Sequence, residues 1–151
     1  QSVFDEGNYD PANEPDIAYP YLFSRFKGEE WRTQKLVKEL LAKYFTTKPD
    51  GIPGNDDTGT MSAWAIFNMM GFYPDCPGEP SYTLSTPVFD KVTIRLDAEV
   101  WGREQLVIET ERPSDDSLYI REMELGGKRL SRFRISHQEL VEGGKLRFVL
   151  R

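Results

Sequence analysis

The sequence is nearly devoid of the residues that build disulfides, zinc sites and histidine-based catalytic sites. Of its 151 residues, Cys76 is the only cysteine and His137 the only histidine. A single cysteine cannot form an internal disulfide, and without Cys/His pairs there is no zinc-binding pattern. His137 lies far along the chain from the acidic motifs, so no Ser-His-Asp or Cys-His catalytic arrangement is credible.

The chain also lacks an excess of positive charge, a long apolar run and a phosphate-binding glycine motif. Lys and Arg number 19 and Asp and Glu 25, which gives a net charge of −6. The basic patch of a nucleic-acid surface and the ~20 apolar residues of a membrane span are both missing. Gly51, Gly54 and Gly59 match no Walker or dinucleotide fingerprint. No signal peptide is visible at Gln1, and because the chain does not start like an initiator sequence, we expect that it has been trimmed.

Helical periodicity dominates the first half of the chain. Apolar residues at helical spacing predict helices at Glu29–Phe45 and at Asp16–Phe26, where Pro20 delays or kinks the helix. A third predicted helix, Thr60–Met70, is apolar nearly all round and is followed by Gly71, a residue suited to the end of a helix. Because two or three helices cannot bury such a helix on most sides, we expect a larger helical domain upstream.

The periodicity changes from helical to alternating in the second half. Tyr73–Pro80 contains three prolines and is interpreted as a linker or a crossover. Gly126-Gly127 predicts a two-residue hairpin turn, and Ser136 with Glu139 predicts a capping box at the start of a short helix. The predicted strands are Val88–Leu96, Gln105–Glu111, Leu118–Leu125, Lys128–Phe133 and Lys145–Leu150. The sequence therefore predicts an α+β protein in which helices precede a small antiparallel β unit.

An acidic turn, Asn55-Asp56-Asp57, stands just before the third predicted helix. Helix capping explains one of its carboxylates but not easily both. A carboxylate near a helix N-terminus is stabilised in the ionised form, which is the form that a general base or a calcium ligand requires. An EF-hand is excluded by register, because Ile66 stands where the bidentate glutamate would be. Capping and chemistry therefore both stay open for Asp56 and Asp57.

A second polar motif, Asn13-Glu14-Pro15-Asp16, precedes the first predicted helix. Its simplest interpretation is a helix start, with proline at the first helical position and an acid in the first turn. Its side-chain oxygens also suit a hard cation such as calcium, which takes six to eight oxygen ligands. The alternative to a structural role is thus a cation or polyol site.

Six short motifs stand in a specific order along the chain: DPANEPD (10–16), YPYLF (19–23), WRTQ (31–34), DGIPGNDD (50–57), MSAW (61–64) and GFYP (71–74). Together they resemble the C-terminal part of the family 92 glycoside hydrolases, which are calcium-dependent exo-acting α-mannosidases. The resemblance covers essentially the whole chain. It implies that residues 1–74 are the last helices of a catalytic (α/α)6 barrel and that residues 75–151 are a C-terminal antiparallel β unit.

The resemblance also implies a reaction, the inverting hydrolysis of α-mannosidic bonds with Ca2+ as cofactor. Asp57 corresponds to the general base, and Asp56 is a weaker catalytic candidate. Asn55 stands where many members have a second aspartate, and it would bind substrate through hydrogen bonds. Glu14 matches a residue that contacts calcium and substrate, with Asn13 as a further calcium ligand. The general acid of the family lies upstream, so we expect the chain to be inactive by itself.

Two interpretations of a different kind are compatible with the same residues. One is a stand-alone calcium or carbohydrate-binding module without catalysis, and the other is an α+β interaction domain whose acids are only helix caps. The resemblance implies mannose-containing glycans as substrates, and the rest of the barrel and an N-terminal domain as partners. It also implies a periplasmic or secreted location.

Overall fold

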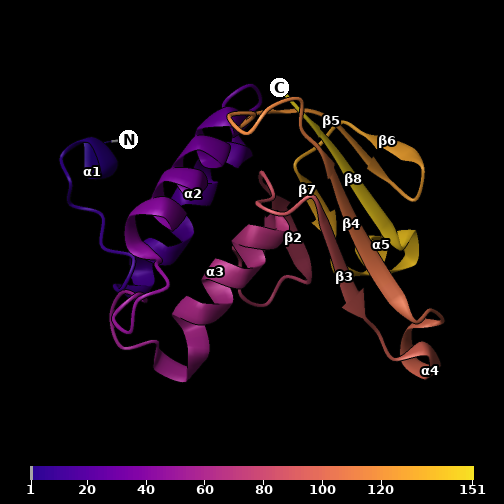
Figure 1. Ribbon diagram of the computed structural model, residues 1–151, viewed down its shortest axis with the longest axis horizontal. Coiled ribbons are helices and arrows are strands. Elements are labelled where there is room, and N and C mark those ends of the chain that lie inside the picture. The colour runs from indigo at the N-terminus through magenta and orange to yellow at the C-terminus, as the bar shows by residue number, and fades with distance from the viewer. Residues whose placement is uncertain (1) are drawn as a thin grey trace.

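The computed structural model describes residues 2–151, with helices in the first half of the chain and strands in the second (Figure 1). The α+β class predicted from the sequence is confirmed. Among the described residues, no helix is long and apolar enough to cross a membrane. The elements of the first half are α1 (Ser2–Asp5), the 3-10 helix η1 (Glu14–Arg25), α2 (Glu30–Tyr44), the 3-10 helix η2 (Asp57–Gly59) and α3 (Thr60–Met70).

Pro20 lies within a 3-10 helix that begins at Glu14, and not in a late or kinked α-helix, whereas the predicted end of α3 at Gly71 is confirmed. η1 contains Pro15 in its first turn, where a helix has no use for the missing N–H, and Pro20 in its interior, where proline removes a backbone donor that an α-helix would use. α3 has the predicted bounds, and Gly71 caps it with φ 94°, a left-handed conformation that glycine adopts without strain. The first long element is thus a 3-10 helix, and the third is an α-helix.

Strands in the second half form two sheets beside the helices (Figure 1). The larger has the order β3-β4-β8-β5-β6 and the smaller the order β1-β2-β7. β4 and β8 run parallel, and the other pairs are antiparallel. The elements are β1 (Phe72–Tyr73), β2 (Ser81–Leu84), β3 (Lys91–Arg95), α4 (Ala98–Trp101), β4 (Gln105–Glu111), β5 (Ile120–Leu125), β6 (Lys128–Leu130), β7 (Arg134–Ser136), α5 (His137–Gly143) and β8 (Lys145–Leu150).

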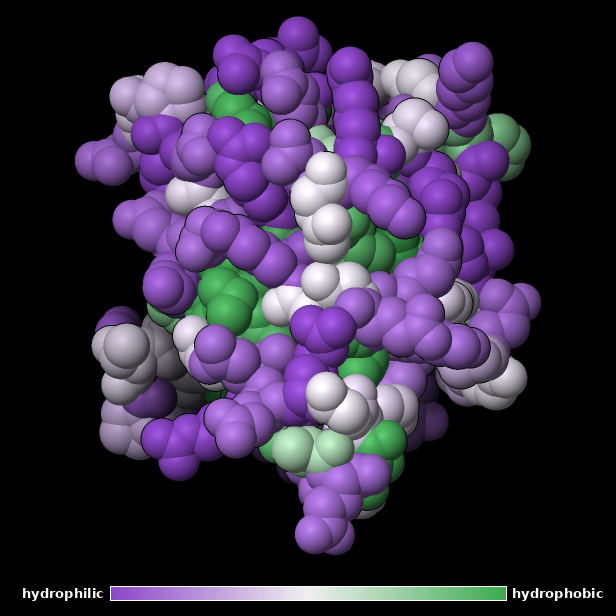
Figure 2. Space-filling model, turned by 90° about the vertical axis from the view of Figure 1, so that its right-hand side faces the viewer, coloured by the Kyte–Doolittle hydropathy of each residue, from purple (hydrophilic) through white to green (hydrophobic). Residues whose placement is uncertain are grey.

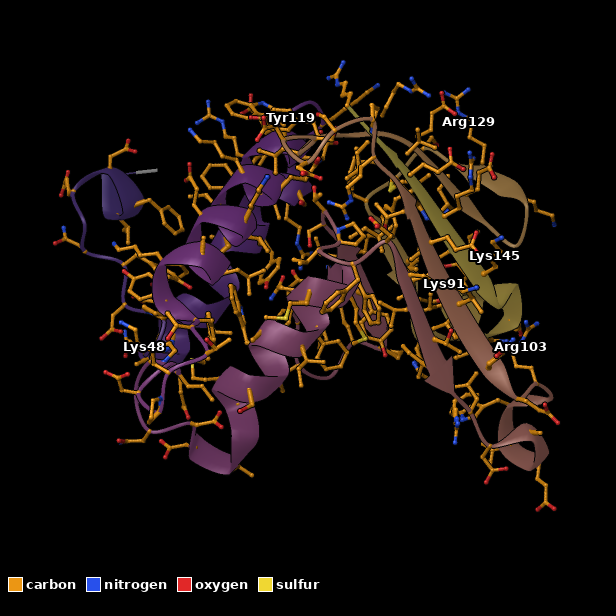
Figure 3. All side chains as sticks on the ribbon, viewed as in Figure 1. Lys48, Lys91, Arg103, Tyr119, Arg129 and Lys145 are labelled. Atoms are coloured by element: carbon orange, nitrogen blue, oxygen red, sulfur yellow. The ribbon has the colours of Figure 1, made fainter. Side chains whose placement is uncertain are left out.

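The large sheet is apolar on one face and charged on the other. Its buried side chains belong to a core that also includes Phe72 and Leu84 of the small sheet. On the outer face, Glu109 pairs with Lys145 at 2.7 Å and with Lys91 at 4.0 Å (Figure 3). Figure 2 shows this face as mainly hydrophilic. Its charges pair mostly with one another, so the face has the character of a solvated surface.

The helices surround a second, aromatic core. Trp64 of α3 stacks on Phe45 with ring centroids 5.4 Å apart, and Tyr21 of η1 stacks on Tyr73 at 4.8 Å. α2 contributes Val37, Leu40 and Leu41. α3 contacts both cores, because Trp64 belongs to this one and Phe67 packs against the core of the sheets, but Ile66 of the same helix is 57% exposed. The expectation that a larger helical domain would complete the burial of α3 stays a prediction.

One buried carboxylate joins the helices to the small sheet. Asp75 accepts hydrogen bonds from Arg25 Nη2 at 2.9 Å, Thr83 Oγ1 at 2.8 Å and Arg134 Nη1 at 3.3 Å. Its side chain is 4% exposed. Asp75 lies in the segment interpreted as a linker, next to the predicted domain boundary between residues 74 and 75. The boundary itself stays a prediction. The hydrogen bonds of Asp75 link the two sides of it.

Candidate functional site

Two loops far apart in the sequence meet at one end of the helices. A small hollow of about 20 Å³ between them is lined by Ala12, Glu14, Ile17, Asn55, Asp56, Asp57, Thr60 and Met61. The loops are so close that a Cβ atom placed on Gly54 would lie 2.5 Å from the Cβ of Ala12. Four of the five site residues predicted from the sequence thus line one hollow, and Asn13 is the neighbour of Glu14.

The acidic loop has an unusual backbone. Asp56 and Thr58 have φ values of 49° and 54°, and they are the non-glycine residues with positive φ in residues 2–151. Aspartate enters this left-handed region more readily than most residues, but a β-branched residue such as threonine is an outlier there. Gly59 follows with φ 78° and leads directly into α3. Positive φ values at Asp56, Thr58 and Gly59, three of four consecutive residues, thus set the direction of the loop.

Asp56 is bonded to the start of α3. Its Oδ1 accepts a hydrogen bond from the backbone N of Ser62 at 2.7 Å, and its Oδ2 accepts one from the Ser62 hydroxyl. The hydrogen bonds from the Ser62 side chain and backbone hold the pKa of Asp56 below its ordinary value. This arrangement satisfies a free N–H of the first helical turn, so it favours a capping role for Asp56.

Asp57 has a different environment from its neighbour. Within residues 2–151 its exposed carboxylate makes no hydrogen bond or ion pair, while its backbone oxygen accepts from the Thr60 hydroxyl at 2.6 Å and from the Thr60 backbone N–H. It stands close to the N-terminus of α3, where the helix dipole favours negative charge. The Asp57 carboxylate is therefore available to water, a cation or a substrate.

On the opposite loop, Glu14 is exposed at the start of η1, and Asn13 is held by a neighbour. The Asn13 amide donates to Asp16 Oδ1 at 3.2 Å, and Asp16 Oδ2 accepts from the backbone N of Asp10 at 3.1 Å. Asp16 is buried. The sequence indicated Asp16 only as a first-turn acid, but the structure shows that it organises the loop that presents Glu14. Asp16 bonds to residues three and six positions earlier in the chain, and such loop contacts produce no hydrophobic periodicity that a sequence analysis could detect.

The side chains facing the hollow are of the right class for calcium but too few to complete its coordination. Glu14, Asn55 and Asp57 offer carboxylate and amide oxygens, which calcium prefers. Calcium takes six to eight oxygen ligands, and residues 2–151 contain no group of three or more His, Cys, Asp or Glu side chains able to hold a metal. These residues fit part of a calcium coordination sphere.

Comparison with known proteins connects this chain to one family of glycosidases. A family model described as the catalytic domain of glycosyl hydrolase family 92 matches residues 1–151. A protein of Arthroderma benhamiae, described as an uncharacterized secreted glycosidase, is 31% identical over 140 residues, which are 92% of this chain and 18% of that protein.

Solved structures of Bacteroides thetaiotaomicron proteins share the fold. The family GH92 α-mannosidase BT3965, solved in complex with mannoimidazole, superposes with a TM-score of 0.84 at 31% identity, over 95% of this chain and 18% of that chain. The family GH92 inverting mannosidase BT2199 gives a TM-score of 0.82 at 34% identity, over 97% of this chain and 19% of that chain. The chain thus spans about a fifth of the length of the proteins it matches.

Proposed function

The chain belongs to glycosyl hydrolase family 92, and we propose that it forms part of a larger enzyme that hydrolyses α-mannosidic bonds. In this proposal the enzyme removes terminal mannose with inversion, and the chain supplies the general base. The mannosidases among the related structures support the substrate class. The observation that carries the role of the chain is the hollow where Asp57, with a free carboxylate, lies beside Glu14.

Inverting hydrolysis assigns one task to each of two carboxyl groups. The base accepts a proton from water as the water oxygen bonds to the anomeric carbon, while the acid gives a proton to the departing glycosidic oxygen. The two groups stand roughly 6.5–9.5 Å apart so that water fits between base and sugar. The exposed carboxylate of Asp57 suits the base, whereas Asp56 would first have to break its hydrogen bonds to Ser62. The acid would come from outside residues 1–151, which would make the chain inactive alone.

Glu14 and Asn13 are the proposed calcium contacts. When bound, calcium would supply positive charge that attracts the hydroxyl groups of a sugar. Glu14 would hold the cation with its exposed carboxylate, and Asn55 would hydrogen-bond to the substrate from across the hollow. The Asn13 amide nitrogen donates to Asp16, so the oxygen of the same amide would be the atom that contacts the cation.

Mannose-containing glycans are the proposed substrates, and a periplasmic or secreted location is proposed. The description of the Arthroderma benhamiae relative as secreted supports the location. The proposed partners of the chain are the remainder of a catalytic barrel and an N-terminal domain, which its share of the related chains supports.

The test is the Asp57→Asn variant of the complete natural enzyme. Asparagine keeps the shape but cannot accept the proton, so kcat on an aryl α-mannoside should fall by ~100-fold or more, as expected for loss of a general base. The melting temperature should change little, because the Asp57 side chain has no partner within residues 2–151. Asp50→Asn, an exposed acid in the same loop, is the matched control and should retain activity. Retained hydrolysis by Asp57→Asn would refute the assignment.

A further inference from the structure

A buried hydrogen bond joins the two elements that begin at the site. The Tyr21 hydroxyl of η1 donates to Asn68 Oδ1 of α3 at 2.9 Å, across 47 residues of sequence. Both residues are 0% exposed. The Asn68 amide nitrogen donates to the backbone oxygen of Trp64 at 2.7 Å, which turns the Asn68 oxygen toward Tyr21. Tyr21 and Asn68 are therefore one fixed contact between two elements.

The contact lies at similar depth on both elements. Tyr21 is seven residues beyond Glu14, and a 3-10 helix rises about 2.0 Å per residue, so the two are about 14 Å apart along η1. Asn68 is eight residues beyond Thr60, where α3 begins, and an α-helix rises about 1.5 Å per residue, so that separation is about 12 Å. A slide of η1 against α3 would shift Glu14 against Asp57 and break this bond.

The apolar surroundings favour the arrangement in which the Tyr21 hydroxyl and the Asn68 oxygen are hydrogen-bonded to each other. Tyr21 stacks on Tyr73, and burial raises the pKa of Tyr21 well above its ordinary value, so its hydroxyl stays neutral and needs an acceptor. Tyr21 belongs to a core of buried aromatic and aliphatic side chains that includes Val37, Leu40 and Trp64. A polar pair in an apolar core favours the one arrangement in which both groups are satisfied.

We propose that Tyr21 and Asn68 are positioning residues that set the placement of Glu14 relative to Asp57. The inference rests on the proposed function of those two carboxylates. A second buried bond to η1 offers a comparison, because Thr33 Oγ1 of α2 donates to the Pro20 oxygen at 2.7 Å. α2 carries no candidate site residue, so this bond holds η1 without setting its relation to Asp57.

The experiment compares Tyr21→Phe with Thr33→Val in the complete natural enzyme. Each substitution removes one buried hydroxyl and leaves one acceptor unpaired, so both should lower the melting temperature to a similar degree. At a temperature where both are folded, Tyr21→Phe should lose about tenfold in kcat with little change in KM, since small misplacements of catalytic groups are costly. Thr33→Val should stay within about twofold of the wild type.

Hydrogen exchange provides a readout that does not depend on turnover. The Ser62 amide bonds to Asp56, and the Asp16 amide bonds to the Asn13 oxygen, so both report on the loops of the site. Tyr21→Phe should speed exchange at both amides, and Thr33→Val should not. Unchanged exchange in Tyr21→Phe, or equal effects of the two variants, would overturn the inference. Wild-type enzyme without mannosidase activity would instead refute the proposed function, and the exchange result would still decide the positioning role.

Discussion

Replacing Asp75 by alanine removes the acceptor shared by Arg25, Thr83 and Arg134 at the junction of helices and small sheet. Deleting one partner of a buried ion pair costs about 3–5 kcal/mol when the other charge stays buried. Here Arg25 and Arg134 are 43% and 28% exposed, so both can regain water. Their share should therefore be about 1 kcal/mol or less each.

The larger share belongs to Thr83. Its hydroxyl is buried in β2, and a buried donor without its acceptor costs about 1–3 kcal/mol. The free energy of unfolding should thus fall by about 2–4 kcal/mol in Asp75→Ala. Asp75→Asn keeps an oxygen for Thr83 and loses only the charge, so its loss should be about half as large.

Urea unfolding followed by circular dichroism measures these losses. Asp90→Ala is the control, because Asp90 also pairs with an arginine, Arg112, at 2.7 Å but is 77% exposed. Its loss should stay below about 1 kcal/mol. Equal losses in Asp75→Ala and Asp90→Ala would refute the reasoning from burial. A loss in Asp75→Asn as large as in Asp75→Ala would show that charge, and not the Thr83 hydroxyl, dominates.

Three further predictions concern the site and the end of α3. Because hydrogen bonds from Ser62 lower the pKa of Asp56 in the folded state, its stabilisation is present above the unfolded pKa of about 3.9 and is lost as pH falls through the folded value. Thermal melts from pH 7 to pH 3 should therefore show a smaller decline for Asp56→Asn than for the wild type. Gly71→Ala should destabilise more than Gly7→Ala in urea unfolding, by about 1 kcal/mol or more, because both have positive φ but only the Gly71 Cβ would meet Pro87, at 2.6 Å. Removing calcium with a chelator should lower both activity and melting temperature of the natural enzyme, and Glu14→Gln should weaken the response to added calcium in a thermal-shift titration.

Long periodic segments made much of the fold predictable. α3, β4 and β8 have the bounds predicted from their apolar pattern, and the capping box of Ser136 and Glu139 is confirmed. The short strands β1, β2 and β7 were not predicted, because two to four residues are too few to show alternation. The parallel pairing of β4 with β8 is equally invisible in the sequence, since it depends on how the chain returns through α5.

The site was predictable as a set of residues but not as an arrangement. Asn55, Asp57 and Glu14 were identified by motif, and their roles in chemistry stay predictions. Two side-chain contacts that fix η1, Tyr21 with Asn68 and Arg25 with Asp75, join residues 47 and 50 positions apart. Such pairs follow from packing of whole elements, and a single sequence carries no local pattern for them.

The difference between Asp56 and Asp57 arises from the backbone. Two adjacent aspartates are chemically equal in the sequence. In the structure, Asp56 has a left-handed backbone and its carboxylate bonds to Ser62. Thr58, on the other side of Asp57, also has a left-handed backbone. A β-branched residue held there costs of order 1–3 kcal/mol, and such strain persists where surrounding contacts enforce it. The Asp56–Ser62 bonds and the Gly54–Ala12 contact are those constraints. Since a plain helix cap needs no such strain, its presence supports a loop shaped to expose the Asp57 carboxylate.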